Sequence, residues 1–228
     1  MKIYGFYFIA LINNWREVVK PQLTRIFNSS LMNDTDKLYV HVFYQDENDF
    51  YRVESLLTNL TSKVEITKST FNNYEFPTLE LVKEKSKTEE FYCWYIHTKG
   101  VSITENTKTF YHGSQDLSYL LDCVRDWREY MEYFIIDNSK NCLNHLDNGF
   151  DACGVQLSQA QNPKYYTFSG NFWWSKSSYI QKLPELTPEF KKNRWNAESW
   201  IGMGEGNLMN LHTNNAGYME KITENYKI

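Results

Sequence analysis

Residues 91–97 read Phe-Tyr-Cys-Trp-Tyr-Ile-His, and Thr98-Lys99-Gly100 follow them directly. A continuous apolar and aromatic run of this length is typical of a β-strand that is buried on both faces. Strands of that kind belong to mostly parallel sheets with helices on both sides. The run therefore predicts a central strand of an α/β domain, with a histidine, a threonine and a lysine at its carboxyl end.

The residues before this strand alternate between strand and helix patterns. Apolar or β-branched runs predict strands at 3–12, 37–44 and 63–67. Apolar residues at helical spacing predict helices at 15–27, 49–60 and 78–87. Strands that alternate with helices in this way build a mostly parallel, Rossmann-type sheet through right-handed crossovers. We therefore expect an α/β fold with helices on both faces of the sheet.

The second half of the chain follows a less regular pattern. It predicts a long helix at 117–138, strands at 150–157 and 167–174, and short helices at 177–183 and 196–201. No low-complexity linker interrupts residues 1–228. We therefore expect a single domain, in which residues 101–228 form an elaborated C-terminal half after the βα units of residues 1–100.

The composition excludes several classes of protein. Of the 228 residues, 42% are hydrophobic and 23% are charged, which is typical of a globular chain and not of a disordered one. The net charge of −4 argues against a nucleic-acid partner, which would need a basic surface. Four cysteines without a C-x-x-C pair favour a reduced, cytoplasmic compartment over a disulfide framework or a zinc ribbon. The high aromatic content, 17%, suits both core packing and the binding of sugars or bases.

The N-terminal apolar run at 3–12 has a second interpretation, as the hydrophobic region of a signal peptide. Asn13-Asn14-Trp15-Arg16 follows it, where a cleavage site would have small residues. The run is also too short to span a bilayer. We therefore interpret it as a buried first strand and expect no transmembrane segment.

Ligands of parallel α/β sheets bind outside the carboxyl ends of the strands. In this chain the corresponding segments are 13–16, 45–46, 70–74 and 98–100. Gly100 permits a close turn, and Lys99 offers a positive charge for a phosphate group. The alternative is that Lys99 only solvates the strand end.

A second candidate segment is Ser169-Gly170-Asn171-Phe172-Trp173-Trp174. A glycine inside an apolar strand indicates a bulge or the close approach of a ligand or another backbone. Adjacent residues of a strand point to opposite faces, so Trp173 could pack in the core while Trp174 lines a cleft, or the reverse. The alternative is that both belong to the core.

The third candidate is Glu198, the single carboxylate in the aromatic segment 194–202. A carboxyl group among aromatic side chains suits a general base, because an apolar environment raises its pKa. The alternative is an acidic residue that complements a helix dipole.

Several common motifs are absent from the sequence. It contains no P-loop, G-x-G-x-x-G, H-E-x-x-H or G-x-S-x-G, which argues against ATPases, Rossmann oxidoreductases, zincins and ordinary esterases. The Asp-x-Asp at Asp34 and Asp36 precedes a predicted strand, so we interpret it as a turn.

Taken in order, Tyr95-x-His97-Thr98-Lys99-Gly100, the segment 169–174 and Ala197-Glu198-x-Trp200 resemble small GT-A-type glycosyltransferases of bacterial surface-polysaccharide clusters and large viruses. The resemblance covers essentially the whole chain. It implies a GT-A-like fold, a nucleotide-sugar donor held by residues 1–100 and a glycan acceptor held by residues 101–228. The implied activity is glycosyl transfer in polysaccharide biosynthesis, with a UDP-sugar as the expected donor.

The resemblance also implies roles for individual residues. Glu198 stands where inverting members keep a carboxylate base at the start of a helix. His212 resembles a histidine that reaches back to the diphosphate or its metal. Lys99 and His212 are the first candidates to meet the charge of the leaving diphosphate, followed by Arg16.

The remaining contacts follow from the same resemblance. His97 and Thr98 would lie beside the donor, and Asn13 and Asp46, at two earlier strand ends, would contact the base and the ribose. Asn171 would hydrogen-bond sugar hydroxyls. The indole of Trp173 or Trp174 would stack on a sugar ring.

Metal dependence is open. GT-A enzymes usually carry an Asp-x-Asp that binds a divalent metal after the strand that here ends at His97, whereas this chain has His-Thr-Lys. Either Lys99 replaces the metal, or Mn²⁺ or Mg²⁺ binds weakly through His97 and His212. We expect activity that is independent of metal or only weakly stimulated by it.

Two other functions also stay open. A non-catalytic carbohydrate-binding module would explain the aromatic content without a nucleotide site. A nucleotidyl-transfer enzyme would share the N-terminal half, but it would need two metal-binding carboxylates at strand ends, and Asp46 has no evident companion.

Overall fold

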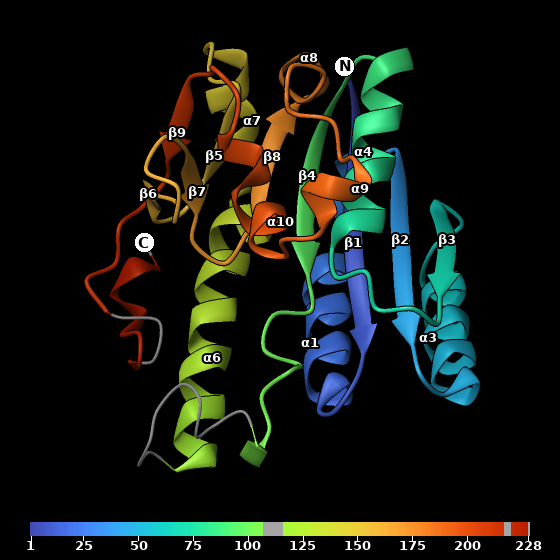
Figure 1. Cartoon of the computed structure of the whole chain (residues 1–228). Coiled ribbons are helices and arrows are strands. Elements are labelled where there is room, and N and C mark those ends of the chain that lie inside the picture. Colours follow the sequence, from blue (N-terminus) through green and yellow to red (C-terminus); the bar gives the residue numbers. More distant parts are fainter. Residues whose placement is uncertain (107–115, 217–219, 228) are drawn as a thin grey trace.

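A seven-stranded sheet forms the centre of the structure, a computed structural model that describes residues 1–106, 116–216 and 220–227. The strand order is β3-β2-β1-β4-β8-β5-β9 (Figure 1). The strands of this sheet are β1 (Lys2–Leu11), β2 (Lys37–Tyr44), β3 (Val64–Ser69), β4 (Phe91–His97), β5 (Ala152–Gly154), β8 (Trp173–Lys176) and β9 (Leu208–Asn210). β8 alone runs antiparallel to its neighbours, β4 and β5, within this sheet. The prediction of a mostly parallel α/β sheet is therefore confirmed.

The first half follows the predicted alternation closely. Helices α1 (Trp15–Asn28), α3 (Glu47–Leu60) and α4 (Phe76–Thr88) connect the four parallel strands. Strand β1 is buried over almost its whole length, as expected for a first strand in the core. The predicted turn at Asp34 is instead a short helix, α2 (Leu31–Asp34), and the carboxylate of Asp36 accepts a hydrogen bond from the backbone N–H of Ile3.

Side chains of the sheet alternate between two hydrophobic clusters, one on each face. Trp94 and Ile96 of β4 pack into the cluster formed with α1, α3, α6 (Leu117–Glu132) and α7 (Ser139–Asp147). Cys93 and Tyr95 pack into the other, formed with α4, α8 (Ser177–Ile180) and α10 (Trp195–Ser199). Helices thus cover both faces of the sheet, as the buried run at 91–97 predicts (Figure 1).

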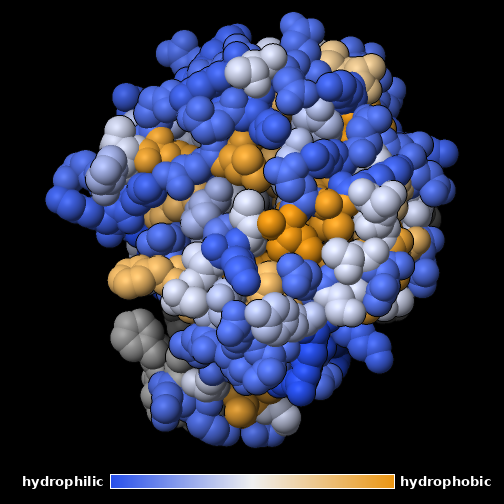
Figure 2. Space-filling view, turned by 90° about the vertical axis from the view of Figure 1, so that its right-hand side faces the viewer, coloured by the Kyte–Doolittle hydropathy of each residue, from blue (hydrophilic) through white to orange (hydrophobic). Residues whose placement is uncertain are grey.

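The β3 end of the sheet is an edge, and Figure 2 shows that the face there is mainly hydrophilic with small hydrophobic areas. Glu65 and Lys68 of β3 are exposed. Charged side chains on an edge strand discourage pairing with strands of other molecules.

The second half departs from the prediction where left-handed residues break extended segments. The strand expected at 167–174 is two strands, β7 (Tyr166–Phe168) and β8, because Gly170 (φ 85°) and Asn171 (φ 59°) form a turn between them. The strand expected at 150–157 is likewise divided into β5 and β6 (Leu157–Gln159), at Gln156 (φ 52°). β6 and β7 pair in a separate two-stranded sheet.

Shorter elements complete the described chain. The helix expected at 117–138 is α6 followed by a π-helical turn, Tyr133–Asp137. The remaining elements are α9 (Pro188–Lys191) and the 3₁₀ turns Trp200–Gly202 and Glu224–Tyr226. Residues 107–115, 217–219 and 228 of the predicted single domain lie outside the described residues.

All four cysteines are buried and unpaired: Cys93, Cys123, Cys142 and Cys153. Within the described ranges, we find no helix with the length and apolar character needed to span a membrane.

Candidate functional site

A cavity of about 390 Å³ lies at the carboxyl ends of β1 and β4. Five segments line it: the end of β1, residues 72–75 before α4, residues 97–103 after β4, the turn residues 169 and 170, and residues 194–198. The cavity therefore lies where ligands of parallel sheets bind, and it brings together the three segments that the sequence analysis singled out.

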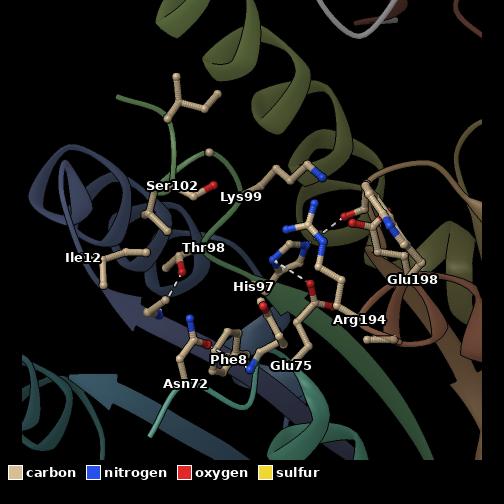
Figure 3. A pocket seen from close by; sticks show the side chains of 18 of the residues that line it. Phe8, Ile12, Asn72, Glu75, His97, Thr98, Lys99, Ser102, Arg194 and Glu198 are labelled. Carbon is tan, nitrogen blue, oxygen red and sulfur yellow. Dashed lines mark hydrogen bonds and ion pairs between the residues drawn. The ribbon is translucent and has the colours of Figure 1, made fainter. Parts of the chain in front are cut away.

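His97 lies at the base of the cavity with both ring nitrogens next to acceptors. Its Nε2 is 3.0 Å from the backbone oxygen of Gly170, and its Nδ1 is 3.5 Å from Oε1 of Glu75 (Figure 3). The ring is only 10% exposed. His97 therefore links the end of β4 to the turn before β8.

Hydrogen bonds and backbone conformation fix the next three residues, 98–100. The Thr98 hydroxyl accepts a hydrogen bond of 2.9 Å from the backbone N–H of Ala10. The Lys99 carbonyl accepts one of 3.2 Å from Arg128. Gly100 has a φ of 93°, and a Cβ at this position would clash with the side chain of Val124. Glycine is thus required for the turn that directs residues 98–100 along the cavity wall.

Glu75 is a cavity residue that the sequence analysis missed. Its Oε2 accepts hydrogen bonds from the Tyr95 hydroxyl (3.1 Å) and from Nδ2 of Asn171, while its Oε1 faces His97. Burial, followed by the neighbouring Glu75 carboxylate, raises the pKa of Tyr95 well above its usual value, so Tyr95 stays a hydrogen-bond donor. The sequence feature that could have identified Glu75 is its position directly after the predicted strand-end segment 70–74.

Tyr74, next to Glu75, has a φ of 51°, an unusual conformation for an aromatic residue. Its backbone N–H donates to Oδ1 of Asn72, which closes a local turn. Strained residues of this kind gather at functional sites. Asn72 and Tyr74 both line the cavity.

Glu198 lines the opposite wall, on the short helix α10. This helix has only five residues, so a dipole role for the carboxylate has little support. Arg194, also missed as a site residue, lies 4.4 Å from the ring centre of Trp195 and lines the same cavity. Figure 3 shows Lys99, Arg194 and Glu198 extending toward one another.

Asn171 does not line the cavity itself. It is buried behind the wall, where its Nδ2 donates to Glu75 and its Oδ1 accepts from the Trp173 indole at 2.9 Å. Asn171 therefore positions the Glu75 carboxylate and does not itself contact a ligand in the cavity.

The two adjacent tryptophans correct an expectation. They do point to opposite faces of the sheet, Trp173 into one cluster and Trp174 into the other, but both are fully buried. The Trp174 indole donates to the Ile135 carbonyl, and Trp173 stacks on Tyr95. Because helices cover both faces of the sheet here, neither ring lines the cavity.

Four residues predicted to contact the donor are not among those that line the cavity. Asn13 donates to the Val101 carbonyl, Arg16 pairs with Asp49, and Asp46 caps α3 through the backbone N–H of Asn48. His212 contacts the Tyr130 hydroxyl at 2.9 Å and stacks on Phe134. Of the predicted site residues, the cavity is lined by His97, Thr98, Lys99 and Glu198.

A metal bound by His97 and His212 does not fit these contacts. Both nitrogens of His97 have other partners, and His212 lies against Tyr130 and Phe134. In the part of the chain that the structure describes, no three His, Cys, Asp or Glu residues form a group that could hold a metal ion. We therefore derive no catalytic step through a metal.

The fold and the cavity define a mixed α/β protein with a mostly parallel central sheet and a candidate site at its carboxyl edge. The chain belongs to the family described as "Domain of unknown function (DUF8361)", whose model matches residues 9–225. No curated protein matches the sequence.

A solved structure similar to this one is 4-diphosphocytidyl-2C-methyl-D-erythritol synthase from Anaerococcus prevotii DSM 20548. The alignment has 9% sequence identity and a TM-score of 0.42, and it covers 99% of this chain and 92% of the other. A similarity of this degree assigns no activity, so function has to be argued from the cavity itself.

Proposed function

We propose that the protein is a glycosyltransferase that moves a sugar from a nucleoside-diphosphate-sugar, with UDP as the expected nucleotide, to a hydroxyl of a glycan acceptor. The observation that supports this most strongly is one cavity, at the carboxyl edge of a parallel sheet, that holds two carboxylates and two cationic side chains. The carboxylates are Glu75, which already accepts hydrogen bonds from Tyr95 and Asn171, and Glu198. The cations are Lys99 and Arg194.

The reaction is an inverting single displacement. Glu198 takes the proton from the acceptor hydroxyl as its oxygen forms a bond to the anomeric carbon of the donor sugar. The bond between that carbon and the diphosphate oxygen breaks at the same time, and its electron pair leaves with the nucleoside diphosphate. The products are the extended glycan, the nucleoside diphosphate and the protonated Glu198.

The leaving diphosphate gains negative charge, which has to be stabilised within the cavity. Lys99 provides a compact charge and Arg194 a planar group that can bind two phosphate oxygens at once. Arg194 takes the place that the resemblance suggested for His212. In this proposal the two side-chain cations stabilise the diphosphate, and the activity is independent of a metal or only weakly stimulated by one.

The exposed aromatic rings at the cavity favour a second candidate, a carbohydrate-binding module without catalysis. Tyr74 and Trp195 line the cavity and are 44% and 37% exposed. Such a module would bind saccharides and would have no use for a nucleotide.

Nucleotide binding separates the two functions. Thermal unfolding of the full chain would be measured with UDP, GDP, CDP and ADP, first in EDTA and then with Mn²⁺. A ligand at 100 times its Kd stabilises the folded state by about 2.7 kcal/mol, which is a rise in Tm of roughly 5–11 °C for a chain of this size. We expect such a rise with one nucleotide in EDTA, and a much smaller one for Lys99→Ala and Arg194→Ala. Lys192→Ala is the matched control, because Lys192 is exposed and does not line the cavity. The absence of a shift with every nucleotide, with and without Mn²⁺, would contradict the proposal.

A further inference from the structure

Trp195 differs from every other tryptophan of the chain. All seven lie in the described residues, and six of them are between 0% and 8% exposed, whereas Trp195 is 37% exposed. An exposed indole does not contribute the stabilisation that burial of its large apolar surface would give. Its position at the wall of the candidate site indicates that the indole binds something there.

A second exposed aromatic ring comes from a distant part of the chain. Tyr74, in the loop between β3 and α4, lines the same cavity and is 44% exposed. Its left-handed backbone, held by the turn with Asn72, places an aromatic ring there at an energetic cost. Two aromatic side chains from separate segments thus border one cavity.

The position of Trp195 relative to Glu198 selects the kind of ligand. The two residues are three apart in α10, and residues at this spacing have Cβ atoms about 5–6 Å from each other on one helix face. A ring stacked on the indole would therefore hold its hydroxyl groups beside the Glu198 carboxylate. The Arg194 guanidinium packs over one face of the indole, so a sugar ring would have to stack on the other face.

We infer that Trp195 and Tyr74 form the acceptor subsite and bind a pyranose ring of a glycan. The apolar face of a pyranose matches an aromatic ring, and its hydroxyl edge matches the carboxylates of Glu75 and Glu198, which line the same cavity. That the bound sugar is the acceptor rests on the proposed function. The inference assigns the stacking role to Trp195 in place of Trp173 or Trp174.

A nucleobase could also stack on an aromatic ring. A general base has to reach the acceptor hydroxyl, so the ring that lies beside Glu198 is the acceptor's and not the nucleotide's. Measuring glycoside binding and nucleotide binding on the same variants distinguishes which of the two ligands stacks on Trp195.

The experiment uses saturation-transfer NMR on the full chain with methyl glycosides of glucose, galactose, mannose, N-acetylglucosamine and glucuronate. Affinities are measured for wild type, Trp195→Ala and Trp195→Phe. Tyr51→Ala is the matched control, since Tyr51 is 52% exposed on α3 and does not line the cavity. UDP binding is measured on the same four proteins by thermal shift.

We expect at least one pyranoside to bind, with affinity lowered about tenfold by Trp195→Ala, largely kept by Trp195→Phe and unchanged by Tyr51→Ala. UDP binding should be alike in wild type, Trp195→Phe and Tyr51→Ala, and Trp195→Ala should weaken it less than it weakens glycoside binding, since the indole also supports Arg194. The inference is overturned if no glycoside shows a Trp195-dependent signal, or if Trp195→Ala removes UDP binding and spares the glycoside. Trp195-dependent glycoside binding without any nucleotide binding would support the saccharide site and contradict the transferase.

Discussion

Replacing Glu75 should loosen the contact between the end of β4 and the turn before β8, because this carboxylate accepts hydrogen bonds from both. The Tyr95 hydroxyl and Asn171 Nδ2 donate to the same oxygen, and the side chain of Glu75 is only 12% exposed. Glu75→Ala would leave the Tyr95 hydroxyl without its acceptor, at about 1–3 kcal/mol, whereas Asn171 Nδ2 would keep the Ala197 carbonyl at 3.3 Å. We therefore expect a loss of at least about 1–3 kcal/mol in the free energy of unfolding. Glu75→Gln keeps one acceptor oxygen and should cost less.

A double-mutant cycle isolates the Tyr95 contact from other effects of the substitution. Urea unfolding would be measured for wild type, Glu75→Ala, Tyr95→Phe and the double variant. A hydrogen bond to a charged acceptor is worth about 1.5–3 kcal/mol, so the two substitutions should couple by that amount. Glu189→Gln, on an exposed side chain of α9, is the control and should change stability by less than about 0.5 kcal/mol. Additivity of Glu75→Ala and Tyr95→Phe to within about 0.5 kcal/mol would refute the described arrangement.

Two further predictions concern the core. Trp173→Ala and Trp174→Ala should each lose about 3–5 kcal/mol of stability by urea unfolding, since both rings are fully buried; a stable Trp173→Ala or Trp174→Ala protein with altered sugar binding would contradict this. Burial lowers the pKa of His41 below the ordinary value of a histidine, so the folded state prefers the neutral ring, which bonds Thr67 and Ser69. The stability that this preference contributes is present above the unfolded pKa and is lost as pH falls through the folded one. Unfolding free energies should therefore decrease from pH 7 to pH 5, and by a smaller amount in His41→Gln; an equal decrease in both proteins would exclude His41 as the cause.

Much of the fold could be predicted because the relevant signals are local. The buried run at 91–97 and the alternation of strands and helices before it depend on side-chain periodicity within short segments. The same alternation places Trp173 and Trp174 on opposite faces. Both rings are buried because helices such as α6 and α8 pack on the two faces of the sheet. The sequence pattern of the strand does not show where these helices pack.

The candidate site was predictable only in part, for a related reason. His97, Thr98 and Lys99 could be found because they follow a recognisable strand and ligands bind at such ends. Glu75 acquires its role from Asn171, which is 96 residues away in sequence. Trp195 and Tyr74 stand out only by their exposure, which no local pattern reports. His212 and Asp46 were predicted from a motif and from a strand-end position, and in the fold they bond to Tyr130 and to the backbone N–H of Asn48.

The most direct test of the account is the turnover of a UDP-sugar in EDTA by wild type, Glu198→Gln and the control Glu205→Gln, whose exposed carboxylate does not line the cavity. Release of UDP would be followed with a saccharide identified by the NMR panel as acceptor. A general base contributes about 10²–10⁴-fold. We predict a loss of that size in Glu198→Gln with unchanged UDP binding, and wild-type turnover in Glu205→Gln. Turnover by Glu198→Gln within a few-fold of wild type would contradict the central claim that this carboxylate activates the acceptor.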